Sequence, residues 1–473
     1  MAADRERARG GAEYDLLVLG TGSAGMAAAI RGAELGARVG IVESGTIGGT
    51  CVNVGCIPSK NLLAAAEHVH AARRGFPGIE PYEPRFDWRA VLAQKSALVE
   101  GLRRSKYLEV LASYPAIEVL RGQARLLGDG RVGVGGSEQR ARKVVIATGA
   151  SPWVPPVPGL RELEPLDSTT AMELESLPRS LLVLGGSAVG LELGQMFARF
   201  GVRVIVLELL PRLLAGEEPA VSEALRSYLQ EEGLEIHTGI RGTDASRSDG
   251  EVVLRVDAGG RAREFRAERI LVAAGRRANT EALDVAAAGV ALERGFVRVD
   301  ATMRTSNPDI YAAGDVTGGP GFVYVAALGG GIAAENALTQ RGREIDLRAV
   351  PRVTFTTPQV GAVGLTEEEA VRAGHRIEVR QLELEYLPRA AVSRDARGFV
   401  KLVAEAGTGT LLGVHALAPN AGELLGEATL AVRLGLRVQD LTETLHPYLT
   451  WVEALKLGAQ TFTTDVTKLS CCA

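Results

Sequence analysis

Two close pairs of cysteines are the residues best suited to chemistry in this 473-residue sequence. The pairs are Cys51 with Cys56 and Cys471 with Cys472, and they are the only cysteines in the chain. No apolar leader precedes Tyr14, and few cysteines are typical of a reducing, cytoplasmic compartment, where structural disulfides are rare. Close cysteine pairs in that setting are more often catalytic or metal-binding.

The first pair lies in the string Gly-Gly-Thr-Cys-Val-Asn-Val-Gly-Cys-Ile-Pro-Ser-Lys at residues 48–60. Residues five apart on a regular helix point about 140° apart and rise about 7.5 Å, which suits a disulfide poorly. Gly55 and Pro58 permit an irregular backbone that would bring the sulfurs together. A helix beginning here would lower a thiol pKa. Two buried core cysteines are the alternative, but the glycine-rich flanks favour a reactive dithiol.

A nucleotide-binding unit precedes the dithiol. Residues 15–43 predict a strand, a glycine turn, a helix and a second strand. The turn Gly20-Thr-Gly22-Ser-Ala-Gly25 has the spacing that lets backbone N–H groups and a helix N-terminus approach a pyrophosphate. Glu43 ends the second strand, where a carboxylate can accept a ribose hydroxyl. A chance glycine cluster is the alternative, but the strand, the helix and the acid favour a nucleotide site.

The same pattern recurs at residues 180–208. The turn Gly185-Gly186-Ser-Ala-Val-Gly190 is a relaxed version of the fingerprint, again between a strand and a helix. The duplication predicts two nucleotide sites, of which the first is expected to take FAD and the second a nicotinamide coenzyme. Glu208 at the second strand's end suits a free 2′-hydroxyl and repels a 2′-phosphate, so it points toward NADH. Arg212 could still reach a phosphate, and the choice between NADPH and NADH stays open.

The predicted fold class is α/β, with two doubly wound Rossmann-like domains followed by an α+β domain from about Pro351. A helical stretch is expected over residues 86–111. The longest uncharged run, Val316–Ala334, is interrupted by glycines, and we expect a buried strand and turn there, not a membrane helix. The expected domains are an FAD-binding domain in two parts (1–150 and 276–345), an NAD(P)-binding domain (151–275) and a dimerisation domain (346–473). The net charge of -4 argues against a nucleic-acid partner.

The dithiol string resembles that of the flavoprotein disulfide oxidoreductases, the glutathione reductase-like family, and the resemblance extends from Tyr14 to the C-terminus. It implies FAD beside Cys56, whose thiolate contacts the flavin, and an outward-facing interchange thiol at Cys51. It also implies that Lys60 lies near the flavin and pairs with Glu192. Further expected cofactor contacts are Ser23, Thr50, Thr148, Gly149, Gly275 and Asp315. Taken alone, an Asp in the position of Asp315 is more often a helix cap.

The C-terminal region departs from the disulfide-reducing members of this family. Those members carry a His–Glu pair that moves protons to the dithiol. Here Glu453 keeps the spacing, but Tyr448 stands at the histidine position and His446 lies two residues earlier. A phenol, with an ordinary pKa of about 10, is a poor base near neutral pH. Disulfide or dihydrolipoyl exchange is therefore expected to be weak.

Cys471 and Cys472 next to the last residue suit the capture of a soft, thiophilic cation, since thiolates outcompete oxygen and nitrogen ligands for it. An incidental terminal pair and a redox relay are the alternatives. The missing histidine and the vicinal pair together resemble the mercuric reductases of the family. That resemblance implies the NAD(P)H- and FAD-dependent reduction of Hg(II), with Cys51, Cys56, Cys471 and Cys472 as metal ligands. Tyr107 matches a tyrosine beside the metal site, although an ordinary helix-face aromatic is a serious rival.

The resemblance also implies a homodimer in which the tail of one subunit serves the dithiol of the other. Hg(II)–thiol complexes would be the substrate. The thirteen residues before Tyr14 contain no cysteine, so a metal-carrier domain is not expected there. A disulfide or lipoamide reductase is one rival. A flavoprotein that sequesters metal without turnover is the other, and the two nucleotide sites argue against it.

Overall fold

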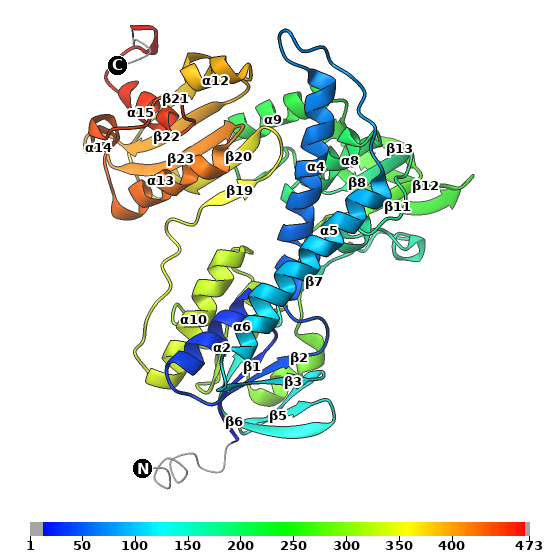
Figure 1. The fold of residues 1–473 in the computed structure, drawn as a ribbon, viewed down its shortest axis with the longest axis vertical. Helices are drawn as coiled ribbons and strands as arrows, with labels where there is room; N and C mark the ends of the chain where they lie inside the picture. The colour runs from blue at the N-terminus through cyan, green and yellow to red at the C-terminus, as the bar shows by residue number, and fades with distance from the viewer. Residues whose placement is uncertain (1–12, 469–473) are drawn as a thin grey trace. The chain divides into compact units, whose positions relative to one another are not determined.

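The computed structural model describes residues 13–468, which form two compact units (Figure 1). The first unit takes the described residues up to Asn61 together with Asp87–Trp153 and Gly275–Ile345. The second unit takes Leu62–Phe86, Val154–Ala274 and the described residues from Asp346. The four-part division expected from the sequence stays a prediction.

The first unit is built on a seven-stranded sheet in the order β3-β2-β1-β6-β5-β4, with β18 also paired to β6. Strands β1, β2, β3, β6 and β18 pair in parallel, whereas β4 and β5 continue as an antiparallel extension of β6. The run Leu16–Leu19 is wholly buried, as a parallel strand covered on both faces must be. The strands are β1 (Tyr14–Leu19), β2 (Val39–Glu43), β3 (Ile117–Arg121), β4 (Ala124–Gly128), β5 (Arg131–Val134), β6 (Ser137–Ile146) and β18 (Ile310–Ala312).

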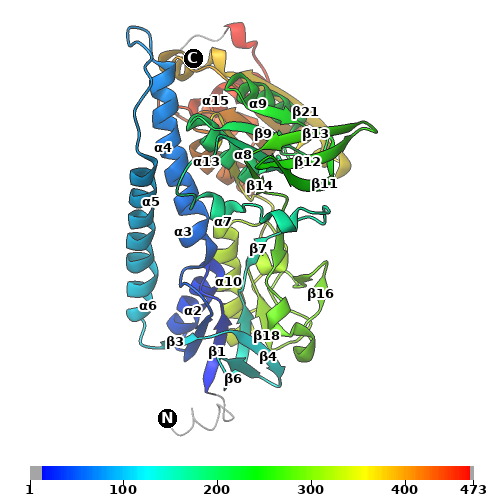
Figure 2. The same ribbon diagram turned by 90° about the vertical axis from the view of Figure 1, so that its right-hand side faces the viewer.

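Two helices pack side by side in this unit, as both views show (Figure 2). They are α2 (Ser23–Glu34) and α10 (Val323–Thr339). The expectation of a strand and turn over Val316–Ala334 is wrong, because most of that run is α10. Its glycines serve close helix packing: a Cβ on Gly330 would lie 2.1 Å from the Ala24 carbonyl oxygen. Residues 332–337 of α10 are all buried. A helix buried all round has no polar face, so its sequence does not show the alternation of apolar and polar residues that predicts a surface helix.

The helical stretch expected over residues 86–111 is present but not regular. It consists of α5 (Trp88–Arg103), a π-helical turn η1 (Arg104–Leu108) and α6 (Glu109–Ala112). Asp87 caps α5 by accepting hydrogen bonds from the backbone N–H groups of Arg89 and Ala90. Single π-turns inside helices occur frequently at functional sites, and this one carries Tyr107.

Short elements complete the first unit. Strand β7 pairs with β15 in an antiparallel ladder, so the chain entering and the chain leaving the second nucleotide-binding segment meet here. These elements are β7 (Ala150–Pro152), β15 (Arg276–Ala278), β16 (Leu292–Glu293), β17 (Phe296–Val297), and the 3-10 turns η3 (Glu281–Leu283), η4 (Val285–Ala288) and η5 (Asp315–Thr317).

The second unit contains the repeat of the nucleotide-binding pattern. A parallel sheet in the order β10-β9-β8-β14 has the expected helix after its first strand, and an antiparallel sheet of β11, β12 and β13 follows. The elements are η2 (Arg161–Leu163), α7 (Ser168–Ala171), β8 (Ser180–Leu184), α8 (Ala188–Arg199), β9 (Arg203–Leu207), α9 (Pro219–Glu231), β10 (Glu235–His237), β11 (Ile240–Ser248), β12 (Glu251–Ala258), β13 (Ala262–Ala267) and β14 (Arg269–Val272).

The rest of the second unit is the α+β region expected from about Pro351. Its antiparallel sheet has the order β19-β20-β23-β22-β21 and packs against helices from the C-terminal part of the chain. The fold class predicted from the sequence is thereby confirmed. The elements are β19 (Arg352–Thr354), β20 (Gln359–Gly364), α11 (Glu367–Arg372), β21 (Ile377–Glu383), η6 (Leu384–Tyr386), α12 (Pro388–Ser393), β22 (Phe399–Glu405), β23 (Leu411–Ala418), α13 (Ala421–Leu434), α14 (Val438–Glu443), α15 (Glu453–Gln460) and η7 (Val466–Lys468). Among the described residues, no helix is long and apolar enough to cross a membrane.

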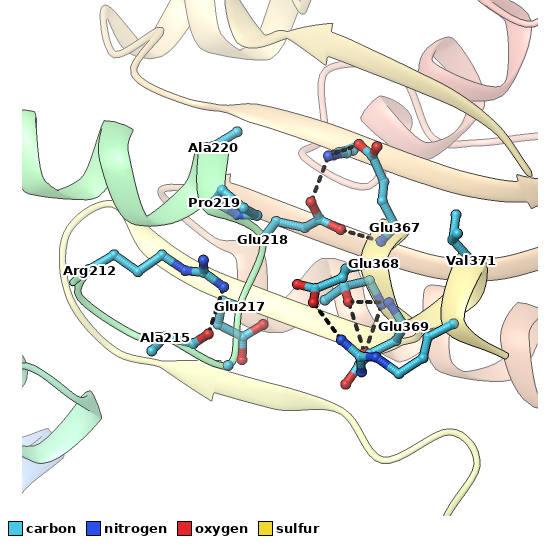
Figure 3. Close-up of a pocket in the computed structure, with 14 residues that line it drawn as sticks. Arg212, Ala215, Glu217, Glu218, Pro219, Ala220, Glu367, Glu368, Glu369 and Val371 are labelled. Atoms are coloured by element: carbon cyan, nitrogen blue, oxygen red, sulfur yellow. Dashed lines mark hydrogen bonds and ion pairs between the residues drawn. The ribbon is translucent and has the colours of Figure 1, made fainter. Parts of the chain in front are cut away.

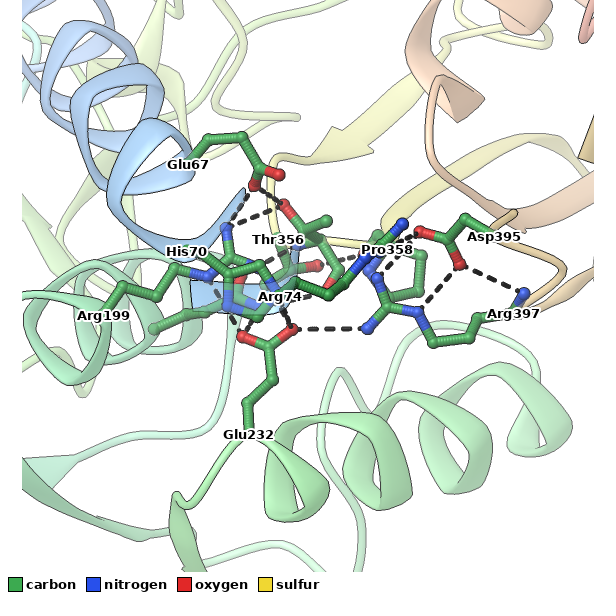
Figure 4. Close-up of polar contacts among 11 residues, drawn as sticks. Glu67, His70, Arg74, Arg199, Glu232, Thr356, Pro358, Asp395 and Arg397 are labelled. Carbon is green, nitrogen blue, oxygen red and sulfur yellow. Dashed lines mark hydrogen bonds and ion pairs between the residues drawn. The ribbon is translucent and has the colours of Figure 1, made fainter. Parts of the chain in front are cut away.

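A buried charge network ties together segments of the second unit that are far apart in sequence (Figure 4). The guanidinium of Arg199, at the end of α8, donates to both carboxylate oxygens of Glu232 at 3.0 Å. Its remaining nitrogen donates to Glu67 at 2.5 Å and to the Thr357 hydroxyl at 3.1 Å. Arg397 reaches the same Glu232 at 3.3 Å. Burial would raise the pKa of Glu232, but the hydrogen bonds and charge of Arg199 outweigh it and lower that pKa.

We predict that Arg199→Met destabilises the protein by about 3–5 kcal/mol, because it leaves the buried Glu232 carboxylate without its main partner. The measurement is the shift of the denaturant midpoint against wild type at pH 7.5. Since the folded pKa of Glu232 is lowered, its contribution is present above its unfolded pKa of about 4.5 and is lost as the pH falls below that value. The gap between variant and wild type should therefore narrow at acid pH.

Arg348→Met is the matched control, because it breaks an ion pair with Asp346 in which the Arg348 side chain is 83% exposed. Exposed pairs contribute little, so this variant should unfold at the wild-type midpoint. Equal shifts for the two arginine variants would contradict the assignment of Arg199 as the centre of the network.

Candidate active site

The dithiol lies in the first unit, at a break between two helices. Helix α3 (Gly49–Val54) carries Cys51, and α4 (Cys56–Arg74) begins at Cys56. Gly55 separates them with φ -127° and ψ -108°, a conformation outside the helical region. A Cβ on Gly55 would lie 2.9 Å from the Thr50 carbonyl oxygen and 3.3 Å from the Cα of Cys51. The irregular backbone expected at Gly55 is therefore present, and glycine is what allows its close approach.

Cys51 and Cys56 are not joined by a disulfide bond, and both are partly exposed. The pKa of Cys51 is raised, first by its hydrogen bond to Cys56, then by burial and by the negative charge of Cys56. The nearby Lys60 acts in the opposite direction and less strongly. The Cys51 thiol is therefore the donor of this hydrogen bond, and its acceptor, Cys56, stands at the start of α4. The helix N-terminus stabilises an anion at that position.

Tyr107 lies close enough to the dithiol to feel its charge. Burial raises the pKa of Tyr107, and the charge of Cys51 adds to it, whereas a hydrogen bond with Ser23 lowers it. The π-helical turn that carries Tyr107 thus brings this residue to the dithiol and to the start of α2. The direct contact of Tyr107 with a metal stays a prediction.

The first glycine turn has the shape that a dinucleotide pyrophosphate requires. Gly20 has φ +111°, and a Cβ there would lie 2.4 Å from the Ala147 carbonyl oxygen. A Cβ on Gly25 would lie 1.9 Å from the Gly20 carbonyl oxygen, so α2 packs directly on the turn. Gly22 has open space up to Gly49, whose Cα would be 3.8 Å from an added Cβ. The expected roles of the three glycines therefore match FAD, and any side chain at Gly20 or Gly25 would destroy the cradle.

Glu43, the expected ribose acceptor, bonds across to this turn. Its Oε2 accepts from the Thr21 backbone N–H at 3.3 Å and also from the Thr21 hydroxyl. Its Oε1 accepts from the Gly45 N–H at 2.7 Å. The carboxylate thus stands at the mouth of the turn with its orientation fixed by backbone donors.

Distant segments meet beside the first nucleotide site. The Thr148 hydroxyl donates to the Asn279 carbonyl at 2.8 Å, and the Asn279 side-chain amide donates back to the Thr148 carbonyl at 2.8 Å. Gly149 accepts from the Asn279 N–H at 3.0 Å. Asn279 was not predicted from the sequence, because its partner Thr148 lies 131 residues away and no spacing pattern indicates such a contact.

Asp315 and Gly275 lie in the same unit, also near a residue that the sequence analysis missed. Gly275 has φ +129°, and its carbonyl accepts from the Trp153 N–H at 3.0 Å. The next residue, Arg276, places its Nε 4.0 Å from Asp315. Asp315 opens a 3-10 turn behind Gly314. Their contacts with a bound flavin nucleotide stay predictions.

The second glycine turn repeats the first in the second unit. Gly185 has φ +122°, and a Cβ there would lie 2.4 Å from the Ala273 carbonyl oxygen. A Cβ on Gly190 would lie 2.0 Å from the Gly185 carbonyl oxygen. Glu208 accepts from the Gly186 N–H at 2.5 Å and from the Leu210 N–H at 2.7 Å. The turn is therefore shaped for a dinucleotide, as expected.

Glu192 on α8 is 4% exposed, and its Oε1 accepts from the Phe355 backbone N–H at 2.8 Å. Three residues further along α8, the Gln195 amide makes a two-way contact with the backbone of Thr357, at 2.9 Å to its carbonyl and 2.8 Å from its N–H. Helix α8 therefore holds residues 355–357 at two points. Lys60 belongs to the first unit, and its pairing with Glu192 stays a prediction.

The C-terminal residues of interest lie in the second unit. Tyr448 is half exposed, and Glu453 begins α15 with its Oε2 buried and without a hydrogen-bond partner among the described residues. His446 is engaged elsewhere: its Nε2 lies 2.7 Å from Glu427, and its Nδ1 lies 3.0 Å from the Thr444 carbonyl oxygen. His446 therefore does not replace the missing base at the position of Tyr448. Cys471 and Cys472 lie outside the described residues.

One pocket of about 800 Å³ opens in the second unit (Figure 3). Its charged side chains pair with one another: Lys401 donates to Glu218 at 2.7 Å and also contacts Glu367, while Arg372 contacts Glu368 at 2.5 Å. Of the residues singled out in the sequence, its lining includes Arg212. The pocket contains neither the dithiol nor the glycines of the second turn, so we place no chemistry in it.

A dithiol and a dinucleotide turn in the first unit, with a second dinucleotide turn in the other unit, define a class of flavin- and nicotinamide-dependent oxidoreductase. The chain belongs to the pyridine nucleotide-disulphide oxidoreductases: residues 14–330 match the model of that family, and residues 350–459 match its dimerisation domain. Family membership confirms the resemblance stated from the sequence and the expected cofactors, FAD and a nicotinamide coenzyme.

Two relatives and one solved structure are similar to this chain over nearly its full length. The chain is 48% identical to the mercuric reductase of Streptomyces lividans over 97% of this chain and 98% of that relative. It is 46% identical to the mercuric reductase of Shigella flexneri, over 97% and 82%. The HOCl-induced flavoprotein disulfide reductase RclA from Escherichia coli is 31% identical, with a TM-score of 0.85 over 94% of this chain and 99% of that one.

We predict that Cys56→Ser lowers the pKa of Cys51 toward the ordinary value of a thiol, because it removes the thiolate that accepts the Cys51 proton. The measurement is the pH dependence of Cys51 alkylation in reduced protein, followed by mass spectrometry of the Cys51 peptide. A Cys471→Ala/Cys472→Ala background removes the other thiols. The midpoint should move down in the Cys56→Ser protein.

Lys60→Met provides a control of opposite sign, because Lys60 lowers the pKa of Cys51. Its removal should move the alkylation midpoint up. A midpoint that stays at the parent value in Cys56→Ser would show that burial alone, and not Cys56, holds the Cys51 proton.

Proposed function

We propose that this chain reduces Hg(II) to elemental mercury, with electrons that pass from a nicotinamide coenzyme through FAD to the Cys51–Cys56 site. The observation that carries the proposal is the dithiol at the Gly55 helix break, in a chain whose mercuric reductase relatives match it over nearly its full length. For a thiol-bound cation the reaction is Hg(SR)₂ + NAD(P)H + H⁺ → Hg(0) + NAD(P)⁺ + 2 RSH. The hydride supplies both electrons, and its proton and one from solvent protonate the two released thiolates.

The dithiol is suited to take mercury from small thiols. Thiolates bind soft cations in preference to oxygen and nitrogen ligands, and two neighbouring sulfurs offer two of them. Cys51 and Cys56 are both partly exposed, so an incoming thiol complex can reach them. Both sulfurs displace small thiolates from the metal, and the Cys51 proton passes to one of the released thiolates, because the raised pKa of Cys51 falls once metal replaces the negative charge that holds its proton.

Bound FAD and coenzyme supply hydride transfer and two-electron delivery to the metal. The chain holds them through the two glycine turns, with Glu43 and Glu208 at the ribose positions. We assign Lys60 and Glu192 to a pair beside the flavin. Tyr107 keeps its proton at neutral pH because its pKa is raised, so its hydroxyl can donate to a thiolate or orient a bound metal thiolate. Tyr448 excludes a base from the site and offers a phenol oxygen beside the metal.

The dimerisation domain at residues 350–459 supports a homodimer. We propose composite active sites, in which Cys471 and Cys472 of one subunit pass Hg(II) to Cys51 and Cys56 of the other. The proposed division of labour is FAD binding by residues 1–150 and 276–345, coenzyme binding by 151–275 and dimerisation by 346–473. A cytoplasmic location is proposed from the cysteine distribution alone.

We predict that Cys51→Ser lowers Hg(II)-dependent coenzyme oxidation by at least about 10³-fold, because one of the two sulfur ligands is lost at the reacting metal. Reduction of the flavin by coenzyme in a stopped-flow experiment should continue. Cys471→Ala/Cys472→Ala should lower turnover on mercury bound to excess small thiol while flavin reduction stays intact. Unchanged turnover in the double variant would remove the delivery role of the tail.

Complementation tests the composite site. Cys51→Ser and Cys471→Ala/Cys472→Ala subunits, co-expressed with different affinity tags and purified as a mixed dimer, should regain about half of the wild-type activity per dimer, because one intact dithiol meets one intact tail. The two parental homodimers are the controls. A mixed dimer no more active than the better parent would mean that each site is built from one subunit.

A specific observation supports one second candidate, since the solved structure matched at 31% identity is a disulfide reductase. Against it, His446 is held by Glu427, and Tyr448 stands where the proton-transferring histidine belongs. Coenzyme oxidation stimulated by Hg(II)–thiol complexes supports mercury reduction. Stimulation by lipoamide or glutathione disulfide, with none by mercury, would establish the second candidate instead.

A further inference from the structure

Resting on the proposed function, we propose that this enzyme is specific for NADH and that Glu208 is the residue that rejects the 2′-phosphate of NADPH. The dinucleotide fold alone accommodates both coenzymes, which differ only at the 2′ position of the adenosine ribose. The residue at the end of the second strand decides between them, because that position faces the ribose.

The Glu208 carboxylate is fixed in place at this position. Both of its oxygens accept backbone N–H groups, Oε2 from Gly186 at 2.5 Å and Oε1 from Leu210 at 2.7 Å. The residue is 9% exposed, so the carboxylate cannot turn away without leaving two donors unpaired. A Cβ on Gly186 would lie 2.6 Å from the Leu213 Cδ2 and 3.0 Å from the Glu208 Cβ, so the acid packs directly against the turn.

The first nucleotide site of the same chain makes the identical arrangement. Glu43 accepts from the N–H of Thr21, the second residue of its turn, and from the N–H of Gly45, two residues beyond itself. Glu208 accepts from the second residue of its own turn and from the residue two beyond itself. Each acid lies 22 residues after its turn donor. FAD carries a free 2′-hydroxyl on its adenosine ribose, so the matched geometry predicts a free 2′-hydroxyl at the second site.

Arg212, the first basic residue after Glu208, is engaged through one of its nitrogens. Its Nη2 donates to the Ala215 carbonyl at 2.8 Å, whereas its Nε is buried without a hydrogen-bond partner among the described residues (Figure 3). It lines the pocket that also contains Glu217. Between Glu208 and Arg212 the chain has Leu209, Leu210 and Pro211, none of which carries a charge. A 2′-phosphate would therefore meet a fixed carboxylate that is followed by three uncharged side chains.

The consequence is a large preference between two otherwise identical coenzymes. A ribose diol donates to a carboxylate, whereas a phosphate dianion is repelled by it and loses water in the process. Like-charge juxtaposition of this kind predicts a preference for NADH of at least about tenfold in kcat/KM.

The first test uses wild-type holoenzyme. Calorimetric titration with 5′-AMP and with 2′,5′-ADP reports the ribose site without turnover, and stopped-flow flavin reduction by NADH and NADPH reports the two coenzymes. The proposal expects 5′-AMP to bind at least about tenfold more tightly and NADH to reduce the flavin at lower concentration. Equal or tighter binding of 2′,5′-ADP, or a preference for NADPH, overturns it.

The second test assigns the preference to Glu208. Glu208→Gln should lower the NADH/NADPH ratio of kcat/KM toward unity, because the affinity for NADH falls and the affinity for NADPH rises. Leu209→Arg, which keeps the acid and adds a cation on an exposed side chain, should also raise NADPH use and serves if the first variant does not fold. Glu223→Gln, on the exposed face of α9, is the matched loss of one charge and should leave the ratio unchanged.

Arg212→Met separates the proposal from its rival. It should leave the ratio unchanged, and a collapse of NADPH use in this variant would show that Arg212 binds the 2′-phosphate. Mercury turnover is scored separately. If Hg(II) stimulates oxidation of NADPH but not of NADH, the proposed function is supported and the NADH specificity is wrong. If NADH reduces the flavin in preference to NADPH but no mercury is turned over, the NADH specificity is supported and the proposed function is wrong.

Discussion

The hydrogen bond between Cys51 and Cys56 is the interaction on which the chemistry of this chain depends. It exists because Gly55 interrupts the helix, which brings residues five apart in sequence to one place. An unbroken helix would separate the two side chains by about 140° in direction. The break also makes Cys56 the first residue of a 19-residue helix, so the charge of the pair resides where the helix field favours an anion. Geometry and ionisation thus follow from one glycine.

A second constraint repeats at both nucleotide sites. Each turn is closed by a carboxylate 22 residues later that accepts backbone N–H groups, and each turn begins with a glycine at positive φ. The same arrangement is therefore used twice, although the two turns share only their first and last glycines. The acid holds the turn in place before a ligand binds, so binding does not include the entropic cost of ordering the turn.

Local patterns of the sequence predicted the parts of this architecture that local physics decides. The two strand–turn–helix units and the helix break at Gly55 are confirmed, because glycine spacing and apolar runs determine them over a few residues. The helix α10 was mistaken for a strand and turn, since its glycines serve packing on Ala24 and not a turn. Asn279 was missed because its function is a contact across 131 residues. The π-turn at Tyr107 has no sequence signal that distinguishes it from an α-helix.

The arrangement near α15 argues for a metal substrate over a disulfide. Reducing a disulfide requires a proton for the leaving thiolate, which a histidine supplies, whereas exchange of a soft cation between thiolates transfers the metal and needs no such proton at the site. His446 contacts Glu427 and the Thr444 carbonyl, and Tyr448 stands at the position of the histidine. The absence of a histidine base therefore disfavours disulfide exchange at the dithiol and does not hinder the binding of a metal there.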